Sequence, residues 1–568
     1  MKLILRQYLA SLRERGELDA ILPDLLSQMG LNVFSRPGIG TRQDGVDVGA
    51  VGRLRRRDPE TLYLFSIKPG NLTRQNWNND GPQSLRPSLC EIIDSYIPNR
   101  LPAEHQGKHI VICIALGGDV EEKVRTQLTG FEHQEEERHP NIRFEEWNGD
   151  RLAQEIEKYL FREALLPPRA RSRLRKSLAL LDEPEASYRH FAELIVSLAE
   201  ANTKTNAKRT RTIRQMTLCL WVLFAWAREV GNLEAAYLSS ELTLLHGWKI
   251  VSLFAGKKGR SAEAVQAAFA STFFAYQSIC AEFLDANVLP HVGKLHAISR
   301  AIQGSCGLDV NLKLFDIIGR LAIYGIWSYW GASCCPDDRS EVRERGLLMT
   351  LECGAAVKEL ISTNPALLLP AKDDQVIDIC IAALLLAFHE DDHPYIAGWL
   401  AEILGRASLA YQAHSHYPCV LSSYSDLLSH PKGRDDEYRK DVTGGSVLYP
   451  MIALWAALLG DEETYDGVAR FKRDYLAHCN FQFWYPDAAT EADFYTGGRE
   501  HGTVFSDVPV DRPKEDFVAQ AFAECEQGSY FREMSAVKCG WWPVVVVGCR
   551  HYRMPVPLQL LEGLRKTE

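Results

Sequence analysis

The chain has 568 residues, of which 46% are hydrophobic and 24% charged, and its net charge is −10. This length exceeds what one hydrophobic core supports, so about three or four units of ~100–200 residues each are expected. The negative charge excludes a surface that attracts nucleic acid all over, so any such contact has to come from local basic patches. No run approaches the roughly 18–20 apolar residues of a membrane span. Because Arg6 also interrupts the N-terminus too early for a signal peptide, we expect a cytoplasmic protein with no membrane partner.

The 14 cysteines are scattered singly, apart from the pair Cys334-Cys335, and no Cys-x-x-Cys spacing occurs. This distribution is typical of reduced core residues in a cytosolic protein. His389 and His393 are spaced four apart around acids, and His414 and His416 lie close together. Both pairs are weak metal candidates, because the run from His389 resembles a helix end and is followed at once by a proline.

Residues 1–165 show the pattern of a compact α/β domain with a mixed central sheet flanked by helices. Apolar periodicity predicts a helix first, then three strands, then helices alternating with two further strands. The continuously apolar strand at 109–116 is expected at the centre of the sheet, covered on both faces. The expected ranges are 1–30 for the first helix, 31–34, 46–54 and 62–68 for the three strands, then helix 86–96, strand 109–116, helix 120–133, strand 142–147 and a helix from 150.

The rest of the chain is predicted to be mainly α-helical, in two domains joined to the first by a basic linker at 166–187. A helical domain is expected over 188–411, and a mainly helical C-terminal domain with long loops over 412–568. In the second of these, the valine run 544–547 could form a strand. The aromatic residues at 481–495 indicate core, or the lining of a pocket. Helical periodicity marks residues 188–200, 213–230, 233–255, 262–285, 313–330, 342–361, 374–388 and 394–411.

Asp47 and Lys68 stand at the ends of two neighbouring predicted strands. The charged stretch 53–60 reads as the hairpin between those strands, so pairing them brings Asp47 and Lys68 to one edge of the sheet. A lysine that closes an apolar strand is costly to bury without a partner. We therefore expect a carboxylate, a phosphate or a hydrated cleft beside Lys68, although a plain salt bridge between the two strand ends would also satisfy it.

Three short motifs in residues 1–165 resemble the restriction-endonuclease-like nucleases, the PD-(D/E)xK superfamily, and in particular its Mrr-like branch. Leu18-Asp19 on a helix precedes Gly30 and a strand; Asp44-Gly45-Val46-Asp47 resembles the acidic second strand of the family; and Ser66-Ile67-Lys68 stands where the family has an acid or glutamine, any residue, then lysine. The strand-to-helix passage at 144–152 also resembles the end of such domains. The resemblance covers about 30% of the chain, which corresponds to 165 of its 568 residues.

The resemblance implies a metal-dependent phosphodiester hydrolase. Asp47 would be the principal ligand of Mg²⁺ or Mn²⁺, Lys68 would orient or deprotonate the attacking water, and Asp19 or Glu17 would hold water or a second metal ion. Ser66 departs from the family pattern, because a hydroxyl is a poor magnesium ligand beside a carboxylate. Another acid is therefore expected to complete the metal site, and the candidates are Glu91, Asp80 and Asp94.

Basic and aromatic residues near these motifs are the expected contacts to nucleic acid, with DNA favoured over RNA. Phosphate contacts of this kind give affinity without base specificity. For the linker alone, simple solvation of its arginines is the competing interpretation. The expected contact residues are Arg53, Arg55, Arg56, Arg57, Arg74, Trp77, Arg171, Arg173 and Arg175.

Fusion of a nuclease-like domain to a large helical region resembles the layout of bacterial defence effectors that act on phage or other foreign DNA. The helical region would then sense a trigger or oligomerise, with a second copy or another defence protein as partner. Two other hypotheses remain open. The first is a degenerate nuclease domain that only binds nucleic acid and serves as a protein-interaction scaffold. The second is a helical sensor that binds a small ligand and licenses a partner.

Overall fold

The structure is a computed structural model, and it describes residues 5–6, 9–10, 18–35, 44–54, 59–78, 84–159, 168–201, 205–302, 304–336, 340–432, 435–497 and 501–565. Contacts between residues divide the chain into two compact units. Unit 1 comprises residues 1–250 and 257–279, and unit 2 comprises residues 251–256 and 280–568. The expected domain boundaries at 165, 187 and 411 stay predictions.

Unit 1 begins with a five-stranded mixed sheet whose strands follow one another in chain order, β1-β2-β3-β4-β5. The first two pairings are antiparallel, and the pairings of β3 with β4 and of β4 with β5 are parallel. This confirms the coarse fold class, a mixed sheet followed by a mostly helical remainder. The strands are β1 (Asn32–Ser35), β2 (Val48–Gly52), β3 (Thr61–Lys68), β4 (His109–Leu116) and β5 (Ile142–Trp147).

The central strand β3 is buried at all eight positions, including the polar residues Ser66 and Lys68. Its antiparallel register with β2 pairs Val48 with Phe65 and Gly52 with Thr61. The start of β2 and the end of β3 therefore lie at one edge of the sheet, and the hairpin between them lies at the opposite edge. Parallel strands all end at the same edge of a sheet. The loops that follow β4 and β5 therefore lie at the same edge as the end of β3.

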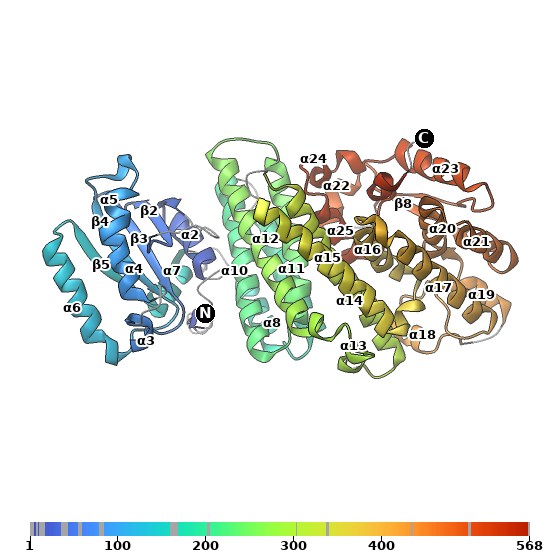
Figure 1. Ribbon diagram of the computed structural model, residues 1–568, viewed down its shortest axis with the longest axis horizontal. Helices are drawn as coiled ribbons and strands as arrows, with labels where there is room; N and C mark the ends of the chain where they lie inside the picture. Colours follow the sequence, from blue (N-terminus) through green and yellow to red (C-terminus); the bar gives the residue numbers. More distant parts are fainter. Residues whose placement is uncertain are drawn as a thin grey trace. The chain divides into compact units, whose positions relative to one another are not determined.

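Helices cover both faces of the sheet (Figure 1). On one face, α4 (Leu85–Glu91), the π-helical turn η2 (Ile92–Tyr96) and α6 (Glu122–Arg138) share a hydrophobic core with Leu62 and Leu64 of β3. On the other face, α2 (Asp19–Gln28) packs on α7 (Gly149–Tyr159). Side chains alternate along a strand, so Ser66 and Lys68, in step with Leu64, belong to the α4 and α6 face.

The basic stretch expected as a linker contains a helix, α8 (Pro168–Ala179), which pairs with α9 (Pro184–Ala201). The reason lies in its spacing, since Ala170, Leu174 and Leu178 recur every four residues and are buried. The intervening arginines occupy the flanks and the solvent side of the same helix. Its apolar residues therefore have the spacing of an amphipathic helix, and the many arginines between them make this spacing hard to recognise in the sequence.

Unit 1 continues as a helical bundle that is attached to the sheet through α2. The Arg214 guanidinium on α10 lies 3.2 Å from the Asp24 carboxylate on α2, and both side chains are almost completely buried. One helical turn earlier, Arg211 donates to the Gln28 side-chain oxygen at 3.4 Å. The helices are α10 (Asn206–Val230), α11 (Glu234–Val251) and α12 (Arg260–Asn287), of which α12 runs on into the sequence of unit 2.

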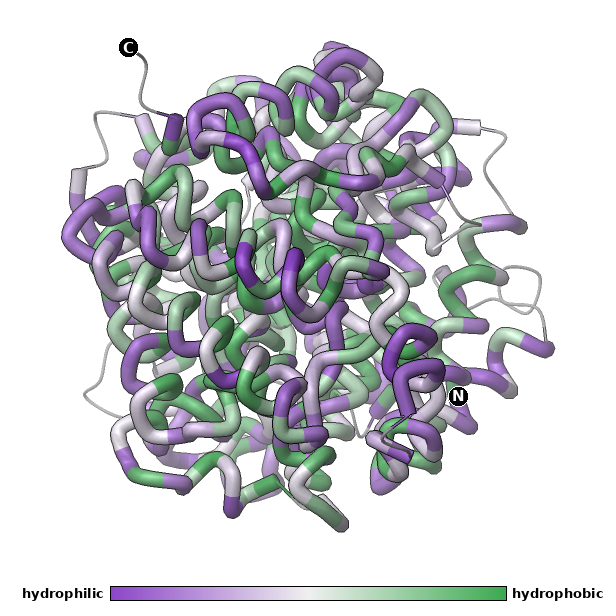
Figure 2. Tube along the Cα trace, turned by 90° about the vertical axis from the view of Figure 1, so that its right-hand side faces the viewer, coloured by the Kyte–Doolittle hydropathy of each residue, from purple (hydrophilic) through white to green (hydrophobic). Residues whose placement is uncertain are grey.

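Unit 2 is almost entirely helical, as expected from its periodicity. In Figure 2 the hydropathy changes repeatedly along the chain, and none of the described helices has the length and apolar composition needed to span a bilayer. Its longer helices are α14 (Gly307–Ser333), α15 (Ser340–Thr363), α16 (Val376–Ala387), α17 (His393–Gln412), α20 (Leu448–Leu459), α21 (Glu462–Asp474), α23 (Lys514–Gln527) and α25 (Pro543–Tyr552).

Two short sheets lie among these helices, and the aromatic residues around them form core. Phe481, Phe483, Trp484, Phe494 and Tyr495 are all buried, in agreement with the core interpretation of this cluster. The sheets pair β6 (Gly445–Ser446) with β7 (Asn480–Phe481), and β8 (Phe483–Tyr485) with β9 (Thr503–Phe505).

The valine run 544–547 is helical, so the strand expected there is wrong. Pro543 occupies the first turn of α25, where its missing N–H costs nothing, and all four valines are buried. Burial on every side outweighs the preference of β-branched residues for strands. The helix packs against α14 and α16, with Arg550 buried and the half-buried Arg553 directly after its last residue.

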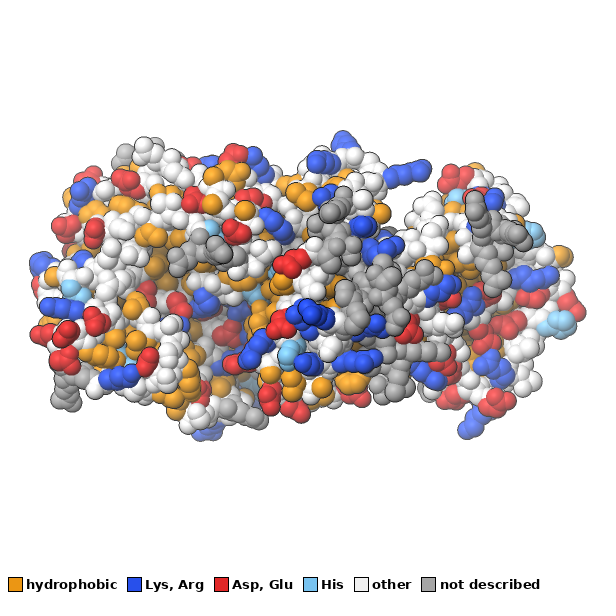
Figure 3. Space-filling model, turned by 180° about the vertical axis from the view of Figure 1, so that it is seen from behind, with side chains coloured by type: hydrophobic (Ala, Val, Ile, Leu, Met, Phe, Trp, Pro, Cys, Tyr) orange, Lys and Arg blue, Asp and Glu red, His pale blue; other side chains and the backbone are white. Residues whose placement is uncertain are grey.

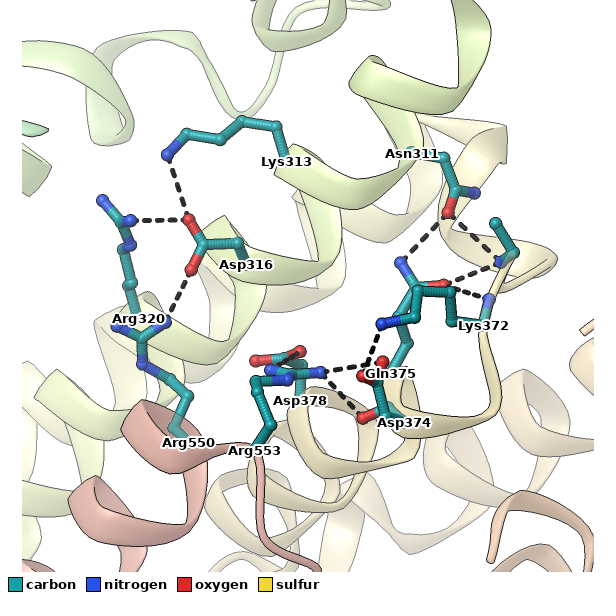
Figure 4. A network of polar contacts seen from close by, with 11 residues as sticks. Asn311, Lys313, Asp316, Arg320, Lys372, Asp374, Gln375, Asp378, Arg550 and Arg553 are labelled. Atoms are coloured by element: carbon teal, nitrogen blue, oxygen red, sulfur yellow. Dashed lines mark hydrogen bonds and ion pairs between the residues drawn. The ribbon is translucent and has the colours of Figure 1, made fainter. Parts of the chain in front are cut away.

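A network of buried charges joins α25 to α14 and α16 (Figure 4). Asp316 of α14 accepts from Arg550 at 2.6 Å and from Arg320 at 2.6 Å, and Lys313 lies 3.0 Å away. Burial alone would raise the pKa of Asp316, but Arg320, Lys313 and Arg550 outweigh it and hold the pKa well below its ordinary value. A second pair, Arg553 with Asp378 at 2.8 Å, ties the end of α25 to α16.

Truncating Arg550 should therefore destabilise unit 2. Arg550→Ala removes a buried partner of Asp316 and should lower the free energy of unfolding by about 3 kcal/mol. Arg473→Ala is the matched control, because Arg473 forms an exposed pair with Asp474 at 2.9 Å and should change stability by less than about 1 kcal/mol. Thermal and urea unfolding of the full chain measure both, and equal effects of the two substitutions would contradict the structural role of the network.

A second prediction concerns α6, where burial and the like charges of Glu146 and Glu136 raise the pKa of Glu132 from 4.5 to about 7. The folded state retains this proton over a range in which the unfolded chain has lost it. Stability from this group is therefore complete below pH 4.5 and is lost as the pH rises to about 7. Glu132→Gln should leave Tm nearly unchanged at about pH 5 and raise it at about pH 8.

Glu137→Gln on the exposed side of the same helix controls for the loss of one negative charge. A gain in Tm from Glu132→Gln that is the same at both pH values would show that ionisation of Glu132 is not its cause.

Candidate functional site

The Asp47 carboxylate is fixed to the backbone of β3. The Asp47 amide donates to the Phe65 carbonyl oxygen at 2.8 Å, and the Ile67 amide donates to the Asp47 Oδ2 atom at 2.7 Å. The acidic group is therefore held between Ser66 and Lys68, at the edge where β3 ends. A carboxylate can accept several hydrogen bonds at once.

Ser66 and Lys68 lie next to this carboxylate and point to the same face of the sheet. Ser66 is 1% exposed, and its Oγ atom makes no hydrogen bond to any described residue. A buried hydroxyl without a partner costs about 1–3 kcal/mol, which folded proteins tolerate mainly where a water, an ion or a substrate group supplies the contact. Lys68 is 6% exposed. The structure thus places Asp47, Ser66 and Lys68 at the same edge of the sheet.

The turn before Asp47 is clamped between two neighbours. Asp44, the first acid of the motif, forms an ion pair with Arg100 at 2.6 Å and so stabilises the turn. Gly45 has φ +81°, and a Cβ there would collide with the Ser88 carbonyl oxygen of α4 and lie 3.0 Å from an Ile92 side-chain carbon. Only glycine fits both the backbone and the space. Glu91, the last residue of α4, lies in the sequence between Ser88 and Ile92 and is half-buried.

Within the parts of the chain that are described, no three His, Cys, Asp or Glu side chains come close enough together to hold a metal ion. Asp80 and Glu17 lie outside those parts, and Asp94 is exposed on η2. The donor set still fits Mg²⁺, which in proteins is often bound by one or two carboxylates together with waters and substrate phosphates. Asp47 would hold the ion with the Ser66 hydroxyl beside it, and Glu91 is the described candidate for a second carboxylate.

Asp19 begins α2, which belongs to the helical layer on the other face of the sheet. Since α2 leads through Gly30 directly into β1, its first residue lies at the same edge as Asp47 and its last at the opposite edge. Asp19 therefore belongs to the helical layer opposite the face of Ser66 and Lys68.

A polar cluster at this edge was missed by the sequence reading. The Asn148 side-chain amide donates to Asp119 at 2.9 Å, and Arg6 lies 2.8 Å from Asp119 and 3.2 Å from Asp150. The Asn71 side chain accepts from the Asp119 amide at 2.8 Å and so ties the loop after β3 to the loop after β4. The available signal was the Gly-Asp or Asn-Gly-Asp that follows β4 and β5, because parallel strands end at one edge.

The basic candidates around the sheet divide between its two edges. Arg74 begins the short helix α3 (Arg74–Trp77), six residues after Lys68 in the sequence, and is exposed. Trp77 is 2% exposed and packs edge-on against Phe131 at 5.7 Å, so its ring belongs to the hydrophobic core. Arg53 follows β2 at the opposite edge, and its neighbours Arg55, Arg56 and Arg57 lie outside the described residues.

The arginines of α8 remain at the surface of the helical part of unit 1. Arg175 is exposed, while Arg171 and Arg173 are half-buried along the flanks of the helix. Arg173 is engaged within the chain, 3.1 Å from the Glu193 carboxylate. Figure 3 shows basic side chains gathered over part of one face with acidic ones among them, so the basic surface is local, as the net charge requires.

Comparison of the chain with family models, with curated proteins and with solved structures found no match. The assignment of a function therefore has to come from the chemistry of the residues described above.

The clamp on the Asp47 loop can be tested at Gly45. Gly45→Ala should destabilise the protein by at least about 1–3 kcal/mol, because the new methyl group meets the Ser88 carbonyl at a strained backbone angle. Gly130→Ala in the middle of α6 is the matched control, since a Cβ there meets nothing within 4 Å. That substitution should stabilise by about 0.5–1 kcal/mol. Thermal unfolding separates the two, and a neutral Gly45→Ala would contradict the close approach to α4.

Proposed function

We propose that unit 1 contains a metal-dependent endonuclease that hydrolyses phosphodiester bonds in DNA, with Asp47 and Lys68 at its active site. The observation that supports this most is the convergence of Asp47, Ser66 and Lys68 at the end of a buried central strand, with the Asp47 carboxylate anchored on the Ile67 amide. A buried lysine beside an acid and an unpartnered hydroxyl is a costly arrangement, and such arrangements concentrate at functional sites.

The strand order supports a restriction-endonuclease-like fold. Such a fold accounts for three antiparallel strands, a crossover helix and a parallel strand. It also accounts for an acid at the start of β2 and a lysine at the end of β3. The five strands and flanking helices of unit 1 are compatible with that arrangement, and the site then lies at the carboxyl ends of β3, β4 and β5. Fold by itself does not carry function, so the proposal depends on the residues at this edge.

In the proposed reaction the protein positions a water molecule and a phosphate. Bound Mg²⁺ or Mn²⁺ supplies neutralisation of the phosphate charge and a lowered pKa of a coordinated water. The Asp47 carboxylate, kept in place by the Ile67 N–H, would hold the ion. The Lys68 ammonium would orient the attacking water or compensate charge on the phosphate, and its burial strengthens that interaction. Arg74 would contact the DNA backbone from the same edge.

A second candidate function is a nucleic-acid-binding domain without catalysis, in which unit 2 is a protein-interaction scaffold. It is favoured by the serine at position 66 and by the absence of a three-ligand metal group among the described residues. In either case we propose that the helical region senses a trigger or associates with a partner in bacterial defence, because the proposed chemistry requires only residues of unit 1.

The two candidates are separated by DNA cleavage. The full chain should cut plasmid DNA in Mg²⁺ or Mn²⁺ and lose this activity with EDTA. Asp47→Asn and Lys68→Met should each reduce the rate by at least about 100-fold, because each removes charge stabilisation at the phosphate. Lys108→Met is the matched control, since Lys108 pairs with Glu60 at 2.7 Å on the opposite edge of the sheet.

Fluorescence anisotropy measures whether each of the two variants still binds DNA. A variant that binds DNA without cutting it has lost the chemical step, whereas a variant that no longer binds DNA has lost substrate binding. A parent protein that binds DNA without cutting it in either metal would support the second candidate. Cleavage that persists in Asp47→Asn and Lys68→Met would show that the reaction takes place elsewhere.

A further inference from the structure

Helix α15 presents apolar side chains on two sides. One side, which includes Cys353, Val357 and Leu360, is buried, and the helix packs along α14 (Figure 1). On the other side, Leu347, Leu348 and Leu351 are 38%, 56% and 50% exposed. At about 100° per residue these three leucines and the exposed Ala355 lie on one face of the helix, which we call the leucine stripe.

Single exposed leucines are ordinary, but three adjacent ones on one helix face are the usual mark of a contact with another surface. The amphipathic pattern of the helix needs only the side that faces α14. Among the described residues, the leucine stripe is therefore covered less than the side of α15 that faces α14.

The charges that flank the leucine stripe reverse sign about its centre. Glu344 precedes the stripe and Lys358 follows it on the same face. Beside them, Arg345 and Glu359 are exposed on one flank. The members of each pair are 14 residues apart, which is about 21 Å along a helix. Glu344 and Lys358 lie seven residues before and after Leu351, and Arg345 and Glu359 lie seven residues before and after Glu352. The stripe is therefore nearly complementary to itself when the second helix runs in the opposite direction and the two-fold axis lies between these two positions.

We propose that a second copy of this chain docks on the leucine stripe, with the two α15 helices antiparallel about a two-fold axis near Leu351. In this arrangement each copy uses the same patch, as a closed dimer requires. Leu351 meets Leu351 of the second copy, Arg345 meets its Glu359, and Glu344 meets its Lys358. Lys358 already lies 2.5 Å from Asp392 of its own chain, so it would be shared between two carboxylates. The contact does not depend on the nuclease activity.

The size of the contact sets the concentration at which the dimer forms. A single pair of helices buries less than the ~1,200–2,000 Å² of a stable complex. We therefore expect a dimer with a Kd in the micromolar range, measured for the full chain by sedimentation and by light scattering over a concentration series. A parent protein that stays monomeric at about 100 µM, at which such a dimer would be well populated, overturns the proposal.

Leu351→Glu should raise the Kd of the dimer by at least about 10-fold, because two carboxylates would then face each other at the two-fold axis. Leu409→Glu is the matched control, since Leu409 on α17 is 67% exposed and lies outside the stripe. It should leave the Kd unchanged. Circular dichroism and thermal melting verify that both variants are folded. Equal dimerisation of the two variants overturns the proposal.

A charge exchange tests the antiparallel register. Arg345→Glu and Glu359→Arg should each weaken the dimer, because each places like charges in contact across the interface. The double variant should recover most of the affinity, since the pairs are restored with their signs exchanged. Recovery is the result that a purely structural role of these exposed residues would not produce. Failure of the double variant to recover overturns the antiparallel pairing.

Discussion

The N-terminal unit depends on β3, a strand that is buried along its entire length and yet ends in a serine and a lysine. Its first residues are apolar and are fixed by two neighbouring strands and by helices on both faces. Its last three residues are fixed by Asp47, whose carboxylate accepts from the Ile67 amide. This hydrogen bond fixes the acid to the backbone of β3 directly before Lys68. The proposed site depends on this constraint.

The same edge collects the loops that follow all three parallel strands. Glycines at 117, 118 and 149 allow these loops to approach one another closely, and Asn71, Asp119 and Asn148 bond them together. A rigid backbone of this kind can support a site, because it holds the side chains attached to it in fixed positions. The distribution of basic residues follows from the same geometry. Arg74 lies at this edge, whereas Arg53 lies at the far one, and the spacing along the sequence does not reveal that difference.

Unit 2 contains charged side chains that are buried and apolar side chains that are exposed. Arg320 and Arg550 are charged and buried, and they are tolerated because Asp316 satisfies both. The leucines of α15 are apolar, and the described residues leave them 38–56% exposed. The first arrangement ties the C-terminal helix α25 to α14. The second leaves a surface whose flanking charges match a reversed copy of themselves.

Apolar periodicity alone determined the order of strands and helices in the sheet domain and the helical character of the remainder, because burial of one face imposes a period of 2 or 3.6 residues. It also placed Asp47 and Lys68 at adjacent strand ends. It failed where burial was total or was masked by charge: the valines of α25 form a helix because they are covered on all sides, and α8 is a helix beneath its arginines. Only the tertiary structure decided that Trp77 lies in the hydrophobic core, that Asp44 forms an ion pair with Arg100, and that Asp119 contacts both Asn148 and Arg6. Those contacts join residues far apart in the chain, and no local pattern encodes which distant segments the folded sheet will bring together.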